Sequence, residues 1–293
     1  MSRTHCRRIV VGTSAALLVS LAPAGVATAA TGSAGLACPE LVSYDAARFS
    51  SPTHIDNPFF PMVPGTRHVY TGTTSGGAHQ LISTVTDLTK VVDGVEARVI
   101  QETDIQDGKV QEDELTLFAQ DDRGNVWNLA EHPELFSAKG KFTGAPDTWV
   151  AGLRNAEGGL HMLAHPQSAQ FRNKQYVQGY APAIQFLDCG RVHSVGGSTT
   201  VPVGTFHDVL STYETSPLES TSAIQTKDYA PSVGIVRVSA INDPLAETLV
   251  LTSNVRLSGA ARRQADQDAL RLDTHGRNAT KLWAQTPPAR LDD

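Results

Sequence analysis

Several common catalytic signatures are missing from this sequence of 293 residues. It contains no G-x-S-x-G, no H-E-x-x-H, no Walker A loop and no G-x-G-x-x-G after a predicted strand. These absences argue against the usual serine hydrolase, zinc protease, nucleotide and dinucleotide sites. They do not exclude an enzyme, because catalytic triads and carboxylate pairs are often scattered along a chain.

Basic runs are also missing, and the chain is acidic. The formal net charge is −6, and it becomes −9 once Arg3, Arg7 and Arg8 are removed with the leader described below. An acidic protein repels phosphate backbones and anionic lipid headgroups. We therefore expect no nucleic acid partner and no role on an anionic membrane surface.

Cysteine is scarce, with three residues in the whole chain. Cys6 lies in the leader, so Cys38 and Cys189 remain, and two cysteines in an exported chain are most simply one disulfide. The alternative is a lipoprotein acylated at Cys38 after "GLAC". We favour the disulfide, because Gly35 stands where a lipoprotein signal needs a bulky apolar residue.

Long apolar runs are missing except near the N-terminus. A basic start, the uncharged run Ile9–Leu21 and the small-residue site Ala27-Thr28-Ala29 are the three parts of a secretory signal, predicted at 1–29. The apolar run is short for a transmembrane helix. The Arg7-Arg8 pair is compatible with either the twin-arginine or the Sec route. We expect a secreted or envelope-associated protein without a transmembrane segment in its mature part.

The pattern that is present is that of β-strands joined by tight turns. Asp93-Gly94 and Asp107-Gly108 are hairpin signals between alternating segments, and 121–125 ("DDRGN") is a further turn. Short, regular spacing of such turns is typical of an antiparallel meander. The predicted fold class is mainly β: a curved antiparallel meander, as a half-barrel or open barrel, with long loops and one C-terminal helix.

The remaining segments complete the predicted domain organisation. A tether at 30–53 precedes a single β-rich domain at 54–275. The last part of this domain, 259–275, has alanines at helical spacing and is predicted to be the C-terminal helix. Gly276 follows it as the predicted end of the helix. Residues 276–293 are predicted to be a flexible tail. Glycine and proline are frequent between 132 and 183, which favours long loops with short strands.

The segment "HIDNPFFPMVPGT" (54–66) is unlike the rest of the chain. Its three prolines hold the preceding residues extended and exclude a helix or central strand. We expect a rigid extended arm that packs Phe59, Phe60 and Met62 against the sheet, with Asp56 or Asn57 capping local amides. A ligand-lining role for the two phenylalanines is the alternative.

Acids and histidines supply weak candidates for chemistry. Glu112 and Glu114 share one face of a predicted strand and could act as acid and base, although a solvated strand face is the preferred interpretation. His161 and His165 are spaced for a shared metal only on a helix, and Pro166 leaves room for one turn at most. We therefore expect no metal and no cofactor.

Three segments carry a resemblance to a known group. "IDNPFFPMVPGT", "AQDDRGNVW" and "YAPSVGIVRV" resemble signature segments of exported bacterial proteins frequent in actinobacteria, a group without an assigned activity. The last segment also resembles a strand entry in half-barrel carriers of the LolA and LppX type. The group has more acids after "GNVW" and after "GYA" than this chain has, which argues against carboxylate catalysis.

Aromatic residues, although only 6% of the chain, gather in its first two-thirds. We expect Phe59, Phe60, Trp127, Trp149 and Tyr176 to contact an apolar ligand. The predicted function is an exported, non-catalytic binding or carrier protein for an apolar or lipid-like molecule. An exported hydrolase or isomerase using dispersed acids and histidines, and an envelope interaction protein with an unknown partner, remain alternatives.

Overall fold

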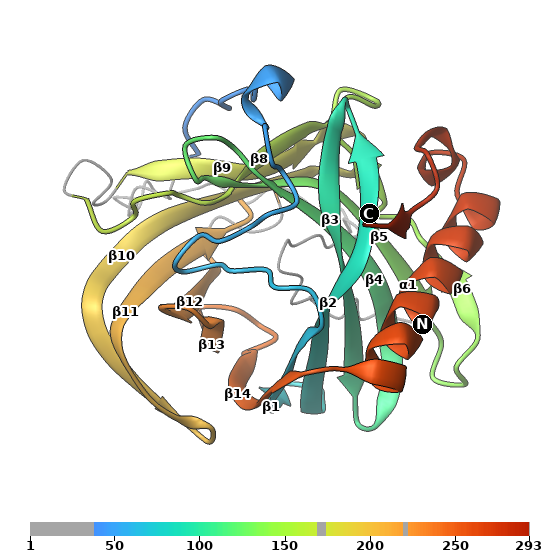
Figure 1. Ribbon diagram of the computed structural model, residues 1–293. Helices are drawn as coiled ribbons and strands as arrows, with labels where there is room; N and C mark the ends of the chain where they lie inside the picture. The colour runs from blue at the N-terminus through green and yellow to red at the C-terminus, as the bar shows by residue number, and fades with distance from the viewer. Residues whose placement is uncertain (1–37, 169–173, 219–221, 293) are drawn as a thin grey trace, which may run out of the picture.

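The computed structural model describes residues 38–168, 174–218 and 222–292, and the predicted leader lies outside them. Within these residues, twelve strands form one closed antiparallel barrel (Figure 1). In sequence order they are β1 (Thr66–Thr74), β2 (Gly77–Val92), β3 (Val95–Gln106), β4 (Lys109–Gln120), β5 (Val126–Phe136), β8 (Glu157–Met162), β9 (Gln175–Ala181), β10 (Phe186–Val201), β11 (Gly204–Thr215), β12 (Ile224–Ala230), β13 (Gly234–Ile241) and β14 (Thr248–Arg256). The short strands β6 (Phe142–Gly144) and β7 (Trp149–Val150) pair with β5.

The prediction of a half-barrel or open barrel is wrong, because the sheet closes through β1. This strand pairs with β2 on one side and with β14 on the other, so that Tyr70 lies opposite Leu81 and Leu251. Closure leaves β1 without an open edge. The mainly β, antiparallel class and the single long helix are confirmed.

The predicted turns are confirmed. Both residues of Asp93-Gly94 and of Asp107-Gly108 have positive φ, with values of 46° and 80° in the first turn and 49° and 73° in the second. This is the backbone that a two-residue hairpin requires. The Asp121 carboxylate accepts hydrogen bonds from the amides of Arg123 and Asn125, both at 2.9 Å, and so fixes the third turn.

The interior of the barrel is a core to which the 54–66 segment contributes. Phe59, Phe60 and Met62 are buried in it with side chains from strands all around the barrel. The segment crosses the barrel as a loop (Figure 1) and is closed by a bridge in which the Met62 amide donates to the Ile55 carbonyl at 2.9 Å. The predicted packing and the capping by Asn57 are therefore confirmed, whereas the shape is a closed loop rather than an extended arm.

A second core lies on the outside of the barrel, beneath helix α1 (Gly259–Ala279) and the segment after it. The helix runs past the predicted stop at Gly276, since this glycine serves close packing instead. A Cβ atom there would lie 2.2 Å from Nε2 of His132 on β5.

The predicted flexible tail is instead packed against the barrel. It contains the 3-10 helix η4 (Trp283–Gln285) and strand β15 (Arg290–Leu291), which pairs with β2. The Trp283 side chain is fully buried in the outer core. Burial of this large ring is the physical reason that the tail is ordered.

The middle segment was predicted to have long loops with short strands, and its strands β8 and β9 are part of the barrel. Gly159 on β8 lies so close to β9 that a Cβ atom would approach the carbonyl carbon of Gln178 to 2.2 Å. This glycine therefore reflects close approach of two backbones, whereas Gly140 and Gly152 have positive φ in turns.

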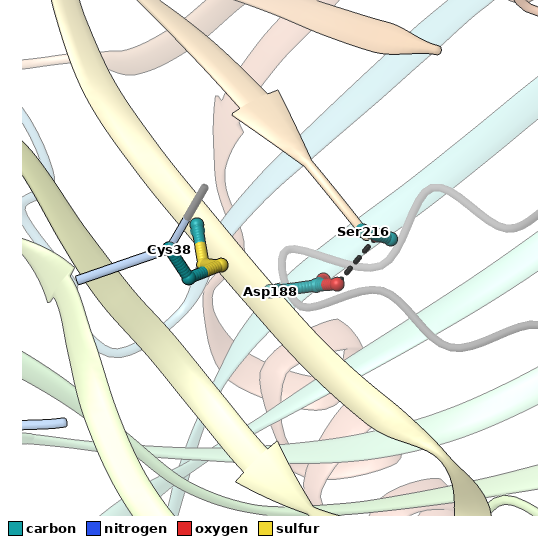
Figure 2. Close-up of a disulfide and its surroundings, with 4 residues drawn as sticks. Cys38, Asp188 and Ser216 are labelled. Carbon is teal, nitrogen blue, oxygen red and sulfur yellow. Dashed lines mark hydrogen bonds between the residues drawn. A yellow bond between two sulfur atoms is a disulfide. The ribbon is translucent and has the colours of Figure 1, made fainter. Parts of the chain in front are cut away.

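The predicted disulfide between Cys38 and Cys189 is present. It joins the segment before the 3-10 helix η1 (Ala46–Arg48) to β10, with a Cα–Cα distance of 5.8 Å. Figure 2 shows the neighbouring Asp188 accepting a hydrogen bond from the Ser216 hydroxyl at 2.5 Å. The disulfide fastens the segment before the barrel to the wall opposite α1.

Candidate functional site

The five aromatic residues predicted to contact a ligand lie in different places. Phe59, Phe60 and Tyr176 belong to the core inside the barrel, while Trp127 and Trp149 belong to the outer core. Of these five residues, Trp149 lines a cavity that is formed by residues in the described part of the chain. The structure therefore does not gather them into one ligand site.

The cavity beside Trp149 is small and mostly apolar. Its volume is about 170 Å³, and it lies where the β7 turn, the end of β9 and the start of the tail meet. Its apolar lining includes Trp149, Leu153, Ala156, Ala181, Ile184 and Leu282. The Trp149 ring stacks on Phe186 with centroids 5.3 Å apart. Its buried Nε1–H has no hydrogen-bond partner in the described part of the chain.

The two glutamates considered as catalytic candidates meet two further acids inside the barrel. Glu112 lies opposite Asp104, and Glu114 lies opposite Glu102, in the register of β3 and β4. All four side chains are buried. The preferred interpretation of a solvated strand face is therefore wrong, since closure of the barrel turns this face inward.

A buried histidine on β2 links these acids to Glu247, which directly precedes β14. His79 Nε2 lies 2.9 Å from Asp104, and Nδ1 lies 3.2 Å from Glu247. Burial alone would lower the pKa of His79, but its hydrogen bonds and charge interactions with both carboxylates raise that pKa to about 9. Burial raises the pKa of Glu247 to about 7, against the effects of His79 and Lys227. At neutral pH the histidine is therefore an imidazolium.

A second buried ion pair stands on the opposite wall. Lys227 Nζ lies 2.6 Å from a Glu214 carboxylate oxygen, and the Tyr229 hydroxyl donates to the other oxygen at 3.0 Å. Burial alone would raise the pKa of Glu214, but Lys227 and the hydrogen bonds hold it below its ordinary value. These groups satisfy one another, which suits a structural role.

The two histidines considered for a metal are not brought together. His161 is buried between the rings of Phe60 and Phe118, with centroids 4.4 and 5.0 Å away. Burial lowers the pKa of His161 to about 3, and the charge of Lys227 acts in the same direction. His165 is exposed beyond the end of β8. Across the described ranges, no group of three or more His, Cys, Asp or Glu is placed to hold a metal ion.

A larger groove, of about 700 Å³, lies between α1 and the outer face of β1 to β5. Asp113 and Glu134 lie directly opposite each other there on β4 and β5. Burial raises the pKa of Asp113 to about 6, against hydrogen bonds from Gln101 and Thr103, and Glu134 adds to the rise. Glu134 pairs with His275 of α1 at 2.7 Å. Such a pair of carboxylates with different environments can in principle act as acid and base.

This groove was missed in the sequence. Asp113 stands between Glu112 and Glu114, and alternation along a strand places it on the opposite face. That alternation was the available signal. The contribution of His275 had no signal, because it depends on where α1 docks, and that of Glu134 depends on the register of β4 with β5.

Comparisons with known proteins add little. No family model matches the chain, and no curated protein matches it in sequence. Two solved structures align with 68% of this chain and 99% of their own, at 16% identity and a TM-score of 0.39. One is a protein from Bacteroides fragilis described as exported, with a YmcC-like fold, and the other a protein from Parabacteroides distasonis described as a lipoprotein. The resemblance to an exported actinobacterial group stays a prediction.

Among the helices of the described residues, none is both long enough and apolar enough to cross a membrane.

Proposed function

We propose that the protein is an exported, non-catalytic binding protein for a small apolar molecule, which it holds in the cavity beside Trp149. The observation that carries this proposal is an apolar space of about 170 Å³ walled by an aromatic ring. Cavities of about 150 Å³ lined by apolar side chains bind benzene or xenon. The available space therefore suits a single ring or a short alkyl group.

The size of the cavity narrows the ligand class. A site for a whole lipid would need several hundred Å³, and the Phe59 and Phe60 side chains occupy the barrel interior instead of lining a space there. We therefore propose a small apolar molecule, or the apolar part of one, in place of a complete lipid.

Export is supported by two independent features. Residues 1–29 have the charge and hydropathy pattern of a secretory signal. The Cys38–Cys189 disulfide is typical of proteins that work in an oxidising compartment. Both features favour a secreted or envelope-associated protein.

Benzene binding followed by NMR tests the proposal. The Trp149 indole N–H resonance, assigned with Trp149→Phe, should shift on titration with benzene. Ala156 lines the cavity, so Ala156→Leu should fill it and abolish the shift. Ala284 is exposed on η4 and provides the matched control Ala284→Leu, which should bind like the unmodified protein. Equal binding by all three folded proteins, or no shift in any of them, would refute the proposal.

The groove beneath α1 favours a second candidate function, an acid–base enzyme. The carrying observation is that Asp113, with its pKa raised to about 6, stands opposite Glu134 in an open groove. If Asp113 were a general acid, the rate should fall as pH rises through about 6.

A panel of p-nitrophenyl esters and glycosides tests this second function. Asp113→Asn and Glu134→Gln should each abolish any hydrolysis that is found. Asp208→Asn, at an exposed position on β11, should retain it. Hydrolysis that survives both groove substitutions would place the activity elsewhere.

A further inference from the structure

A pocket of about 440 Å³ lies on the outer side of the loop that crosses the barrel. Its walls are largely the loop itself, with Pro58, Pro61, Met62 and Pro64 among the lining residues. Arg98 from β3 and Asp292 from the segment after β15 also line it. The pocket thus combines rigid apolar walls with one buried cation.

Arg98 has more hydrogen-bonding capacity than the structure uses. Its side chain is 4% exposed, and its Nη2 donates to the Thr53 carbonyl at 3.3 Å and pairs with the Asp292 carboxylate. Its Nε and Nη1 are buried without a hydrogen-bond partner in the described part of the chain. A guanidinium stays charged at all ordinary pH values and presents a planar fork that matches a carboxylate. The site therefore suits a ligand carboxylate that accepts hydrogen bonds from more than one guanidinium nitrogen of Arg98.

The carboxylate that occupies the site is held by few other contacts. Asp292 is 37% exposed and follows β15, which pairs with β2 over only Arg290 and Leu291. Its amide donates to the Asp87 carbonyl at 2.8 Å. The Asp292 side chain is partly exposed, and a ligand carboxylate that replaces it returns a counter-charge to the buried Arg98. A ligand can therefore displace this side chain without leaving Arg98 unpaired.

One rim group opposes an anion but is already engaged. Asp56 is 68% exposed, lies 3.7 Å from His54 and accepts a hydrogen bond from the Gln120 amide at 2.6 Å. Solvent screens a charge so exposed far more than it screens Arg98. The Asp87 carboxylate also interacts with Arg98, but it accepts a hydrogen bond from Arg262 of α1 at 2.6 Å. The field at the base of the pocket is therefore set mainly by Arg98 and Asp292.

We propose that this pocket binds a small organic carboxylate, whose carboxylate group takes the place of the Asp292 side chain on Arg98. The apolar part of the ligand lies against the prolines and Met62. Binding and the docking of Asp292 compete for the same guanidinium. This site is separate from the Trp149 cavity and does not depend on it.

Titration of benzoate followed by methionine methyl NMR tests the proposal. Met62 lines the pocket, whereas Met162 is buried inside the barrel and serves as an internal control. Benzoate should shift the Met62 methyl resonance and leave that of Met162 unchanged. Benzamide, a neutral molecule of the same shape, should leave both unchanged.

Substitution of Asp292, whose side chain competes with the ligand for Arg98, gives the clearest test of the proposal. In Asp292→Asn the affinity for benzoate should rise by about tenfold or more, as expected when one charged competitor is lost. In Arg98→Gln binding should disappear. Unchanged affinity in Asp292→Asn, or benzoate binding that survives Arg98→Gln, would overturn the proposal.

Substitutions at an exposed position on the rim of the pocket test the proposal even if Asp292→Asn or Arg98→Gln fails to fold. Val63 is 43% exposed and lines the pocket. Val63→Asp should weaken benzoate binding several-fold relative to the matched neutral variant Val63→Asn. Equal affinity of these two variants would count against an anion site.

Discussion

The packing of the tail depends on a buried ion pair that can be tested directly. Lys90 Nζ lies 2.7 Å from Asp273 Oδ1, with side chains 0% and 2% exposed, and donates to the Pro287 carbonyl at 2.6 Å. The ammonium group also lies 4.7 Å from the centroid of the Trp283 ring. Asp273 in turn accepts hydrogen bonds from the Trp283 indole at 2.8 Å and from the Ala289 amide at 3.0 Å. The pair thus joins β2, α1 and the tail.

Substitution of both partners should cost less than the sum of the two single substitutions. Asp273→Asn leaves the Lys90 cation buried without a counter-charge, which typically costs about 3 to 5 kcal/mol of unfolding free energy. Lys90→Met should cost less, because the Asp273 carboxylate keeps its bonds from Trp283 and Ala289. The double variant should be more stable than the sum of the single changes predicts, by about 2 kcal/mol.

Urea unfolding curves of the four proteins measure this coupling. A double-variant cost equal to the sum of the single costs would refute the reasoning. The pH dependence gives a second check. Burial lowers the pKa of Lys90, and the charge of Asp273 opposes this effect. In Asp273→Asn the pKa should fall further, so stability should recover as pH rises through the folded-state pKa and the lysine loses its proton.

Three further predictions follow from the cores and the buried charges. Phe60→Ala should lower the unfolding free energy by about 3 kcal/mol or more, since the ring is buried inside the barrel. A loss well under 1 kcal/mol would contradict a core role and favour the alternative that this ring lines a ligand site. Gly276→Ala should destabilise by about 1 to 3 kcal/mol, despite the better helix propensity of alanine, because its Cβ atom would clash with His132; a stabilised variant in thermal unfolding would contradict this. Stability should fall as pH rises from about 6.5 to about 9, because the pKa of His79 is raised from 6.5 in the unfolded chain to about 9 in the folded chain; His79→Gln should flatten that slope.

Local features of this fold were readable from the sequence. The Asp-Gly turns and the 121–125 turn depend on backbone conformations that few residue types adopt easily, so they were predicted correctly. The Cys38–Cys189 disulfide followed from the cysteine count. Each of these inferences needs only neighbouring residues or a small number of possible partners.

Features that depend on distant segments were not readable. Closure of the barrel requires β1 to pair with β14, which is far away in sequence, and no local pattern specifies that partner. Apolar and polar residues alternate along part of β3, yet both of its faces are covered over most of its length. The inner face carries Glu102 and Asp104 toward other buried acids, and the outer face lies in the core beneath α1.

The same dependence explains why the candidate sites were hard to find. The cavities of about 170, 440 and 700 Å³ all lie where a segment outside the barrel strands meets the barrel wall. The tail borders the first, the crossing loop and Asp292 border the second, and α1 borders the third. The interior, in contrast, contains an apolar core and paired buried charges. Binding specificity in this fold should therefore follow the loop, the helix and the tail, and substitutions at the barrel's inner face should act mainly on stability.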